Sequence, residues 1–318
     1  MDRRRRRSGA LALATCLGLG GLALAQGPLP LRAVGWTNPK ADVAGVLTTE
    51  PAECYAPAEA LRASAEIGRA AFRTPVLLGG QAARAGLSCE SCHRGGRGNP
   101  DFLFPGVSGA PGSADVTSSL FSSHRGNGRD DPVPIPDLSG PRARLKVAPE
   151  SLETFIHGLI VEEFDGPEPS PAALKGLADY VRSLRPQACP PDATRPVSVK
   201  GLLDDVERAT TAAAGAPDRS TRLLMIAGAR ARLGLIDERF PGSGFAPERH
   251  ALRAADAELA AIAAAVRSGR ADTSQRLAAW RERLPPLARQ LGRREGQSLF
   301  DPKTLRAAVE GRLPERAS

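Results

Sequence analysis

The feature that most constrains this chain is the run Cys89-Glu90-Ser91-Cys92-His93. Its Cys-x-x-Cys-His spacing is the attachment pattern for a covalent c-type haem. In such a site the two thiols form thioether bonds, and the imidazole that follows ligates the iron from one side. The cysteine pair alone would also suit a redox dithiol or half of a zinc site, but the adjoining histidine favours haem. We therefore expect Cys89 and Cys92 to hold one haem c, with His93 as the proximal iron ligand.

The first 25 residues contain the three parts of a secretory signal peptide. Arg3 to Arg7 precede an apolar run from Ala10 to Ala25, which ends in the small-x-small pattern Ala23-Leu24-Ala25. A membrane span and lipid attachment at Cys16 are the alternatives, but the apolar run is shorter than the roughly twenty residues that a bilayer needs. We expect cleavage, a periplasmic or secreted mature protein, and no transmembrane segment in it.

The cysteine usage agrees with export. If Cys16 leaves with the signal peptide, Cys54 and Cys189 remain outside the haem motif, and an oxidising compartment allows them to pair. Such a disulfide would join the two ends of the segment that carries the motif, whereas two separate unpaired thiols are the alternative. A thioredoxin-like role would need a βαβ context around Cys89, which the pattern does not show.

The charge of the chain gives no reason to expect a nucleic-acid partner. Residues 1–25 hold five of the basic residues and one of the acidic ones, so their removal lowers the net charge from +8 to +4. No basic–aromatic interleaving accompanies the remaining charge. Aromatic residues make up only 4% of the chain, so a large prosthetic group would help to fill its core.

Helical periodicity brackets the motif. Residues 26–58 are rich in Pro, Gly and Ala and predict a mostly irregular lead-in, whereas 59–72 place Leu61, Ala65, Gly68 and Phe72 on one helix face. Glycine inside a helix costs about 1 kcal/mol relative to alanine. A close helix–helix crossing at Gly68 would explain its presence.

The stretch that follows the motif, Arg94 to Pro149, is dense in Gly, Pro, Ser and Asp. Loops of this length usually need an organiser, and a haem would supply one. Pro149 to Phe164 then predicts a helix with two apolar faces, buried between two layers. Ser170-Pro171 reads as the N-cap and first residue of a further helix that ends near Leu184.

These segments together resemble a cytochrome c domain. The resemblance covers residues 59–187, and it rests on Gly68 and Phe72, the Cys-His motif and a last helix that reads Leu177-Ala178-Asp179-Tyr180-Val181-Arg182-Ser183-Leu184. It implies that the first and last helices cross near a glycine and an aromatic residue, with the haem beneath. Gly68-x-x-x-Phe72 followed by Leu87-Ser88-Cys89-x-x-Cys92-His93 is similar, more narrowly, to one haem domain of the bacterial di-haem cytochrome c peroxidases. Those enzymes carry two haem motifs and this chain has one, which puts the family's peroxidase mechanism in doubt.

The second axial ligand is open in the sequence. The only methionines are Met1, which leaves with the signal, and Met225, which lies far downstream, so methionine ligation is disfavoured. The resemblance implies a distal histidine on the Gly-rich loop, and His124 is the favoured candidate. His157, on the second apolar face of its helix, and an open or water-bound site are the alternatives. His250 is expected at an exposed helix start.

Charged loop residues offer further partners for the cofactor. Guanidinium groups bind carboxylates bidentately, so four arginines are either candidate partners of the haem propionates or solvated charges: Arg94, Arg97, Arg125 and Arg129. The loop acids match no calcium-binding spacing, so we expect no metal other than the haem iron.

Beyond a Pro-containing linker at 188–197, the chain is rich in Ala, Arg and Leu with helical periods. The pattern predicts helices at 198–213, 218–235, 247–268, 272–292 and 302–312. Pro285-Pro286 should break or kink the fourth. We expect these helices to form a structural or docking bundle.

The sequence thus predicts an all-α protein with a cytochrome c domain, long haem-packing loops and a C-terminal helical bundle. Its parts are a signal peptide (1–25), a lead-in (26–58), the cytochrome c domain (59–187), a linker (188–197) and a helical domain (198–318). The predicted function is that of an exported mono-haem c-type cytochrome, which exchanges one electron with an unidentified redox partner and is an electron carrier rather than an enzyme. A peroxidase-like haem enzyme or subunit acting with a partner haem, and a haem-based sensor or binding subunit, are the alternatives.

Overall fold

The computed structural model describes residues 29–117, 119–124, 128–140, 147–190 and 192–311. The predicted signal peptide, with Cys16, lies outside these residues, as does Arg125. The described chain is mostly helical with two small two-stranded sheets, which confirms the all-α class. None of the helices within these ranges combines the length and the apolar character needed to cross a membrane.

The N-terminal segment carries more structure than we expected for residues 26–58. It contains a 3₁₀ turn η1 (Arg32–Trp36), helix α1 (Val43–Thr48) and strand β1 (Thr49–Pro51). Strand β1 pairs antiparallel with β4 (Thr194–Pro196), which lies in the predicted linker. Three-residue strands leave no periodicity in the sequence, and their pairing joins segments far apart in the chain.

A disulfide joins Cys54 to Cys189 beside this strand pair, with the two Cα atoms 5.2 Å apart. The predicted bridge is therefore confirmed. Together with the β1–β4 pair, the disulfide closes a loop of the chain that contains the Cys-His motif.

Helices α2 (Arg62–Phe72) and α6 (Pro171–Ser183) cross with their backbones in contact. A Cβ atom built on Gly68 would lie 1.8 Å from the carbonyl oxygen of Gly176, so only glycine permits this approach. The close crossing predicted at Gly68 is confirmed. The predicted N-cap is also confirmed, because the Ser170 side chain accepts a hydrogen bond from the Ala173 N–H.

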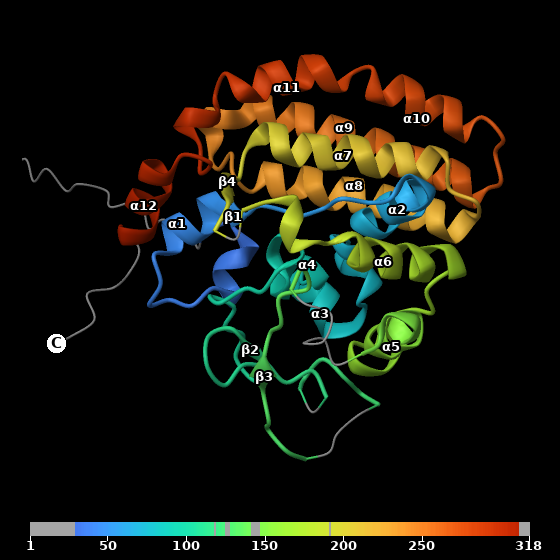
Figure 1. Cartoon of the computed structure of the whole chain (residues 1–318). Helices are drawn as coiled ribbons and strands as arrows, with labels where there is room; N and C mark the ends of the chain where they lie inside the picture. Colours follow the sequence, from blue (N-terminus) through green and yellow to red (C-terminus); the bar gives the residue numbers. More distant parts are fainter. Residues whose placement is uncertain (1–28, 118, 125–127, 141–146, 191, 312–318) are drawn as a thin grey trace, which may run out of the picture.

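The motif and its loops lie on the side of α2 and α6 opposite the C-terminal helices (Figure 1). A 3₁₀ turn η3 (Pro75–Leu77) and helix α3 (Gly80–Ala85) lead to α4 (Cys89–Cys92) and η4 (Arg94–Gly96). The stretch that follows is mainly irregular, as expected. Its only described strands are β2 (Ser113–Ala114) and β3 (Val133–Pro134), which pair antiparallel.

Residues 149–163 are helical, but their predicted burial on both sides is wrong. The segment comprises η6 (Pro149–Ser151), α5 (Leu152–Gly158) and a π-helical turn η7 (Leu159–Glu163). Leu152 and Ile160 are buried, whereas Phe155 is 40% exposed. Helix α5 packs on α6 and lies at the edge of the molecule (Figure 1), so it is not enclosed between two layers.

The C-terminal helices agree closely with the predicted ranges. They are α7 (Val199–Ala214), α8 (Arg219–Asp237), α9 (Ala246–Arg267), α10 (Thr273–Arg281), α11 (Leu284–Gly292) and α12 (Pro302–Glu310), with short 3₁₀ turns at Pro186–Ala188 (η8), Ser243–Phe245 (η9) and Glu295–Gln297 (η10). The predicted fourth helix is divided just before Pro285-Pro286, because proline removes a backbone donor and crowds the preceding turn.

One apolar core extends through most of these elements. Buried residues of α2 and α6, such as Phe72 and Leu177, belong to the same cluster as Val206, Met225 and Leu259 from α7, α8 and α9. Helices α7 and α8 pack directly on α2. The segment with the motif therefore rests on the C-terminal helices through α2.

Replacing Gly68 with alanine should destabilise the fold. The new methyl group would meet the Gly176 carbonyl, so the two helices must separate, and we expect a loss of roughly 1–3 kcal/mol in the free energy of unfolding. Denaturant unfolding measures this. Gly158→Ala is the matched control, since a Cβ there meets no atom within 4 Å and should stabilise α5 by up to about 1 kcal/mol. If both substitutions changed the free energy of unfolding by the same amount, the close contact of α2 and α6 at Gly68 would be contradicted.

Removal of the disulfide through Cys54→Ser/Cys189→Ser should lower the free energy of unfolding by roughly 2–5 kcal/mol, since the bond closes a long loop in the unfolded chain. We would measure the free energy of unfolding for the oxidised wild type, the reduced wild type and the double variant. The reduced wild type and the double variant should have similar values, both below that of the oxidised wild type. If the double variant were as stable as the oxidised wild type, the disulfide would not contribute to stability.

Candidate functional site

Helix α4 is a single turn that displays both cysteines of the motif. The Ser88 N–H donates to the Ser91 hydroxyl at 3.1 Å, which closes the start of the turn. Cys89 and Cys92 are three residues apart in the turn, so they lie on the same face. Both are free thiols in the structure.

The two thiols pack into apolar surroundings. Cys92 and Cys89 lie against a cluster whose buried members are Leu78, Ala82, Leu87, Phe102, Val107, Ala114 and Phe121. Burial raises the pKa of both thiols to about 12. Thiol–disulfide exchange and zinc binding require the thiolate, which such a pKa suppresses at neutral pH.

The imidazole of His93 is fixed by a backbone carbonyl. Its Nδ1 lies 3.1 Å from the oxygen of Pro136. A carbonyl can only accept, so Nδ1 carries the proton. Burial lowers the pKa of His93, against the opposing effect of the Pro136 and Arg97 carbonyls, so the ring is neutral and Nε2 carries the lone pair. Metal-binding histidines characteristically donate their second nitrogen in this way.

Aromatic residues from distant segments complete the surroundings of the motif. Phe121 lies with its ring centroid 5.1 Å from Phe104 and 5.6 Å from Phe164, and the Phe72 ring is 6.3 Å from that of His93. Phe104 and Phe121 come from the long loop stretch that we expected to pack on a cofactor. The sequence did not single them out, or Pro136, because loops carry no periodicity.

His124 lies near this cluster but at the surface. It follows Phe121 by three residues, its side chain is 61% exposed, and its Nε2 is 3.8 Å from Oδ1 of Asp165. The same carboxylate oxygen accepts hydrogen bonds from the Ser123 N–H and hydroxyl, both at 2.9 Å. Asp165 therefore holds the end of this loop. His124 stays a predicted ligand, since nothing in the structure tests iron ligation.

The other two histidines are also accounted for. His157 Nε2 lies 2.9 Å from a carboxylate oxygen of Glu168, and His250 is exposed on α9, as expected. Within the described ranges, no hydrogen bond or ring contact joins His124 or His157 to Cys89, Cys92 or His93.

The loop arginines take different positions. Arg94 donates to the Thr49 carbonyl at 2.8 Å, and Arg97 Nε lies 3.1 Å from Asp137 Oδ2. Arg129 is exposed. Among the residues that the structure describes, no cluster of three or more His, Cys, Asp or Glu side chains is placed to hold a metal ion.

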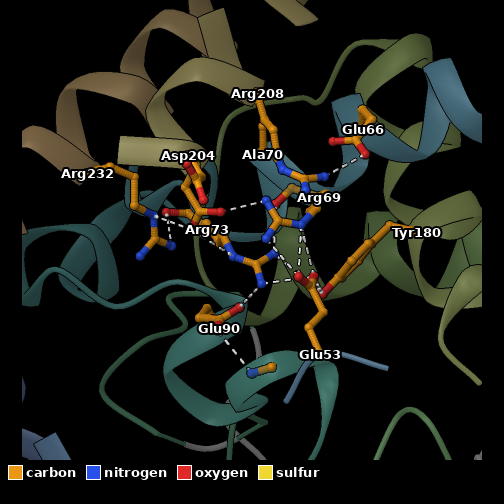
Figure 2. A network of polar contacts seen from close by, with 12 residues as sticks. Glu53, Glu66, Arg69, Ala70, Arg73, Glu90, Tyr180, Asp204, Arg208 and Arg232 are labelled. Carbon is orange, nitrogen blue, oxygen red and sulfur yellow. Dashed lines mark hydrogen bonds and ion pairs between the residues drawn. The ribbon is translucent and has the colours of Figure 1, made fainter. Parts of the chain in front are cut away.

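A buried network of charges lies behind the motif (Figure 2). Glu53 accepts hydrogen bonds from Arg69 Nη2 at 2.7 Å, Arg73 Nη2 at 2.9 Å and the Tyr180 hydroxyl at 2.7 Å. Asp205 of α7 accepts from Arg69 Nη1 at 2.6 Å. Arg69 of α2 and Arg73, which directly follows this helix, thus join the N-terminal segment to α6 and α7.

The network reaches the motif through Glu90. Its Oε2 lies 3.2 Å from Arg73 Nη2, and its Oε1 accepts the Gly95 N–H at 3.0 Å. Burial raises the pKa of Glu90, and Arg73 and Arg232 oppose that effect. The net shift of Glu53 has the opposite direction. Burial acts to raise its pKa, but Arg73 and Arg69 hold the pKa well below the usual range. The sequence analysis missed this network, although Arg69 lies four residues after Ala65 on the apolar face of α2.

Replacing Glu53 should lower the free energy of unfolding and should make that free energy depend less on pH in acid. The depressed pKa of Glu53 means that its contribution is complete above the unfolded-state pKa of about 4.3 and is lost as the pH falls below that value. At neutral pH, Glu53→Gln leaves buried arginines under-compensated and should cost roughly 3–5 kcal/mol. Unfolding measured between about pH 7 and pH 3 should show a shallower loss than in the wild type.

Glu59→Gln is the matched control, because its exposed side chain pairs only with Arg62 in the described structure. It should change the free energy of unfolding by less than about 0.5 kcal/mol. An acid dependence of Glu53→Gln identical to that of the wild type would show that Glu53 is not the group that titrates.

Comparison with known proteins adds no relative. No protein-family model, curated protein or solved structure matches this chain. What the chain does must therefore be inferred from its own residues.

Proposed function

We propose that this chain is an exported mono-haem c-type cytochrome that transfers single electrons. The observation that carries the proposal is the arrangement at α4. Cys89 and Cys92 share one face of a capped turn against an apolar cluster, and the adjoining His93 has its Nδ1 held by Pro136. Covalent haem attachment requires two thiols and an imidazole in this order.

The residues fit the cofactor chemically. The thiols supply two attachment points, the neutral imidazole supplies a nitrogen lone pair at Nε2, and Phe102 and Phe121 supply apolar, water-excluding surface. When bound, haem c supplies a one-electron Fe(III)/Fe(II) couple. The hydrogen bond from Nδ1 to Pro136 orients the ring and increases the basicity of Nε2.

The proposal includes a cytochrome c domain at 59–187 and a C-terminal helical bundle from 198 onward. The crossing of α2 and α6 at Gly68 supports the first, as does the packing of Phe72 on Tyr180 with ring centroids 5.0 Å apart. The mutual packing of α7, α8 and α9 supports the second. The bundle is proposed as the support or docking part of the protein, and the redox partner as another protein.

Export to the periplasm or the cell exterior is part of the same proposal. The disulfide between Cys54 and Cys189 supports it, because such bonds persist in oxidising compartments and are rare in the cytosol.

A peroxidase-like or ligand-sensing role is the second candidate. It is favoured by the position of His124, whose exposed ring faces Asp165. A sixth position that no histidine occupies would give a high-spin ferric spectrum and would bind cyanide, CO or peroxide. A low-spin spectrum insensitive to these ligands would instead favour the carrier, with His124 as the second axial ligand.

The test of the proposal is the production of the mature protein in a host with c-type haem maturation. The purified chain should carry one covalent haem, seen as a mass increase that survives acid–organic extraction and as the absorption spectrum of the reduced protein. Cys89→Ser/Cys92→Ser should abolish covalent attachment. Cys54→Ser/Cys189→Ser is the matched control and should keep it, since that pair lies outside the motif. A wild-type protein without covalent haem would refute the proposal.

Spectra of two further variants would assign the sixth ligand. If His124 ligates the iron, His124→Ala should convert a low-spin ferric spectrum to high spin, whereas His157→Ala should not. The opposite pattern would assign His157.

A further inference from the structure

A cavity of about 150 Å³ lies behind the motif, between η1, α4 and α8. Ser88, Glu90 and Ser91 line it, so it meets a face of α4 different from the one that carries the thiols against Phe102 and Phe121. A cavity of this volume accepts a ligand about the size of benzene. It therefore has room for a small molecule and not for a haem.

Arginines dominate the lining of this cavity. Five contribute to it, together with three glutamates: Arg32, Arg73, Arg94, Arg232 and Arg239 against Glu50, Glu90 and Glu238. Each of the three carboxylates already has an arginine partner. Glu238 pairs with Arg32, Glu90 with Arg73 at 3.2 Å, and Glu50 with Arg195 at 2.8 Å.

Two of the lining arginines, Arg239 and Arg94, have no carboxylate partner in the described structure, and a third, Arg232, has only a distant one. Arg239 is 8% exposed and donates to two carbonyls, of Leu47 at 2.7 Å and Leu299 at 3.0 Å. Arg94 donates to a third carbonyl. Within the described part of the chain, neither has a carboxylate within ion-pair distance.

Arg232 is the least satisfied of the three. It is also 8% exposed, its Nε has no hydrogen-bond partner, and its nearest carboxylate, Asp205, is 4.0 Å away and already bound to Arg69. Its recorded hydrogen bond is a long one, from Nη2 to the Arg73 carbonyl at 3.4 Å. Figure 2 shows Arg232 reaching toward the charge network from α8.

Burial lowers the pKa of Arg232 and of Arg239, the latter to about 10, so the positive charge of these two side chains is held at a cost. Buried charges are normally paired, and an unpaired donor in the interior is destabilising. An anion would compensate these side chains. Guanidinium groups match tetrahedral oxyanions and carboxylates through paired N–H donors.

We propose that this cavity binds a tetrahedral oxyanion of the size of inorganic phosphate through Arg232, Arg239 and Arg94. The site uses neither the thiols nor His93, and Arg94 is its one ligand group that is also a candidate partner of a haem propionate. A bound anion would neutralise the under-compensated arginines at the junction of the N-terminal segment, α4 and α8.

Calorimetric titration of the purified mature protein with phosphate tests the site. We expect saturable binding at one site, similar binding of sulfate, and no saturable heat from chloride at matched ionic strength. Phosphate should also raise the midpoint of thermal unfolding, since a ligand that binds only the folded state stabilises it. Failure of phosphate to bind more tightly than chloride would overturn the proposal.

Two variants locate the site. Arg232→Gln should weaken phosphate binding by roughly tenfold or more, since it removes a charge-assisted interaction. Ala231→Leu should weaken it by filling the cavity without a change of charge, so it decides the matter if Arg232→Gln does not fold. Arg267→Gln, at an exposed position of α9, is the control and should bind as the wild type does. Equal affinity in all variants would place the anion elsewhere, whether or not the protein carries haem.

Discussion

The contact between the backbones of Gly68 and Gly176 determines how the rest of this structure is arranged. With no side chain at either position, α2 and α6 approach until the carbonyl of one helix meets the α-carbon of the other. This approach brings Phe72 onto Tyr180 and places Arg69 and Arg73 beside Glu53. The same helix, α2, packs on α7 and α8 on its other side. One helix crossing therefore fixes both the residues behind the Cys-His motif and the packing of this segment on the C-terminal helices.

The buried charges also restrict how the helices can be positioned relative to one another. Hydrophobic packing fixes the distance between helices but tolerates small shifts, whereas hydrogen bonds to Glu53 and Asp205 require defined positions. Because Arg73 contacts both Glu53 and Glu90, the motif turn is tied to the helix crossing by a single side chain. The hydrogen bond from His93 to Pro136 ties the other side of the motif to the loop near β3.

Helices could be predicted from the sequence where a sustained helical periodicity or a capping residue marks them. The ranges of α7, α8 and α9, the Ser170 cap and the break before Pro285 all follow from local rules. The pairing of β1 with β4, the Phe121 cluster and the carbonyl partner of His93 depend on contacts between segments far apart in the chain. The charge network left no local signal in the sequence around Arg69 and Arg73. Their burial is decided by partners that local patterns do not contain, namely Glu53 and Asp205.

The position of the disulfide has a consequence for how the chain is made. Cys54, Cys89 and Cys92 leave the ribosome well before Cys189, and these four thiols of the described chain allow three pairings among themselves. In an oxidising compartment the first cysteine thus meets two unsuitable partners before its native one, and an early bond to either would consume a thiol of the motif. Formation of the native bridge then depends on the order in which the thiols pair. The spacing of the four cysteines along the chain makes biogenesis, and not only folding, a determinant of whether the site forms.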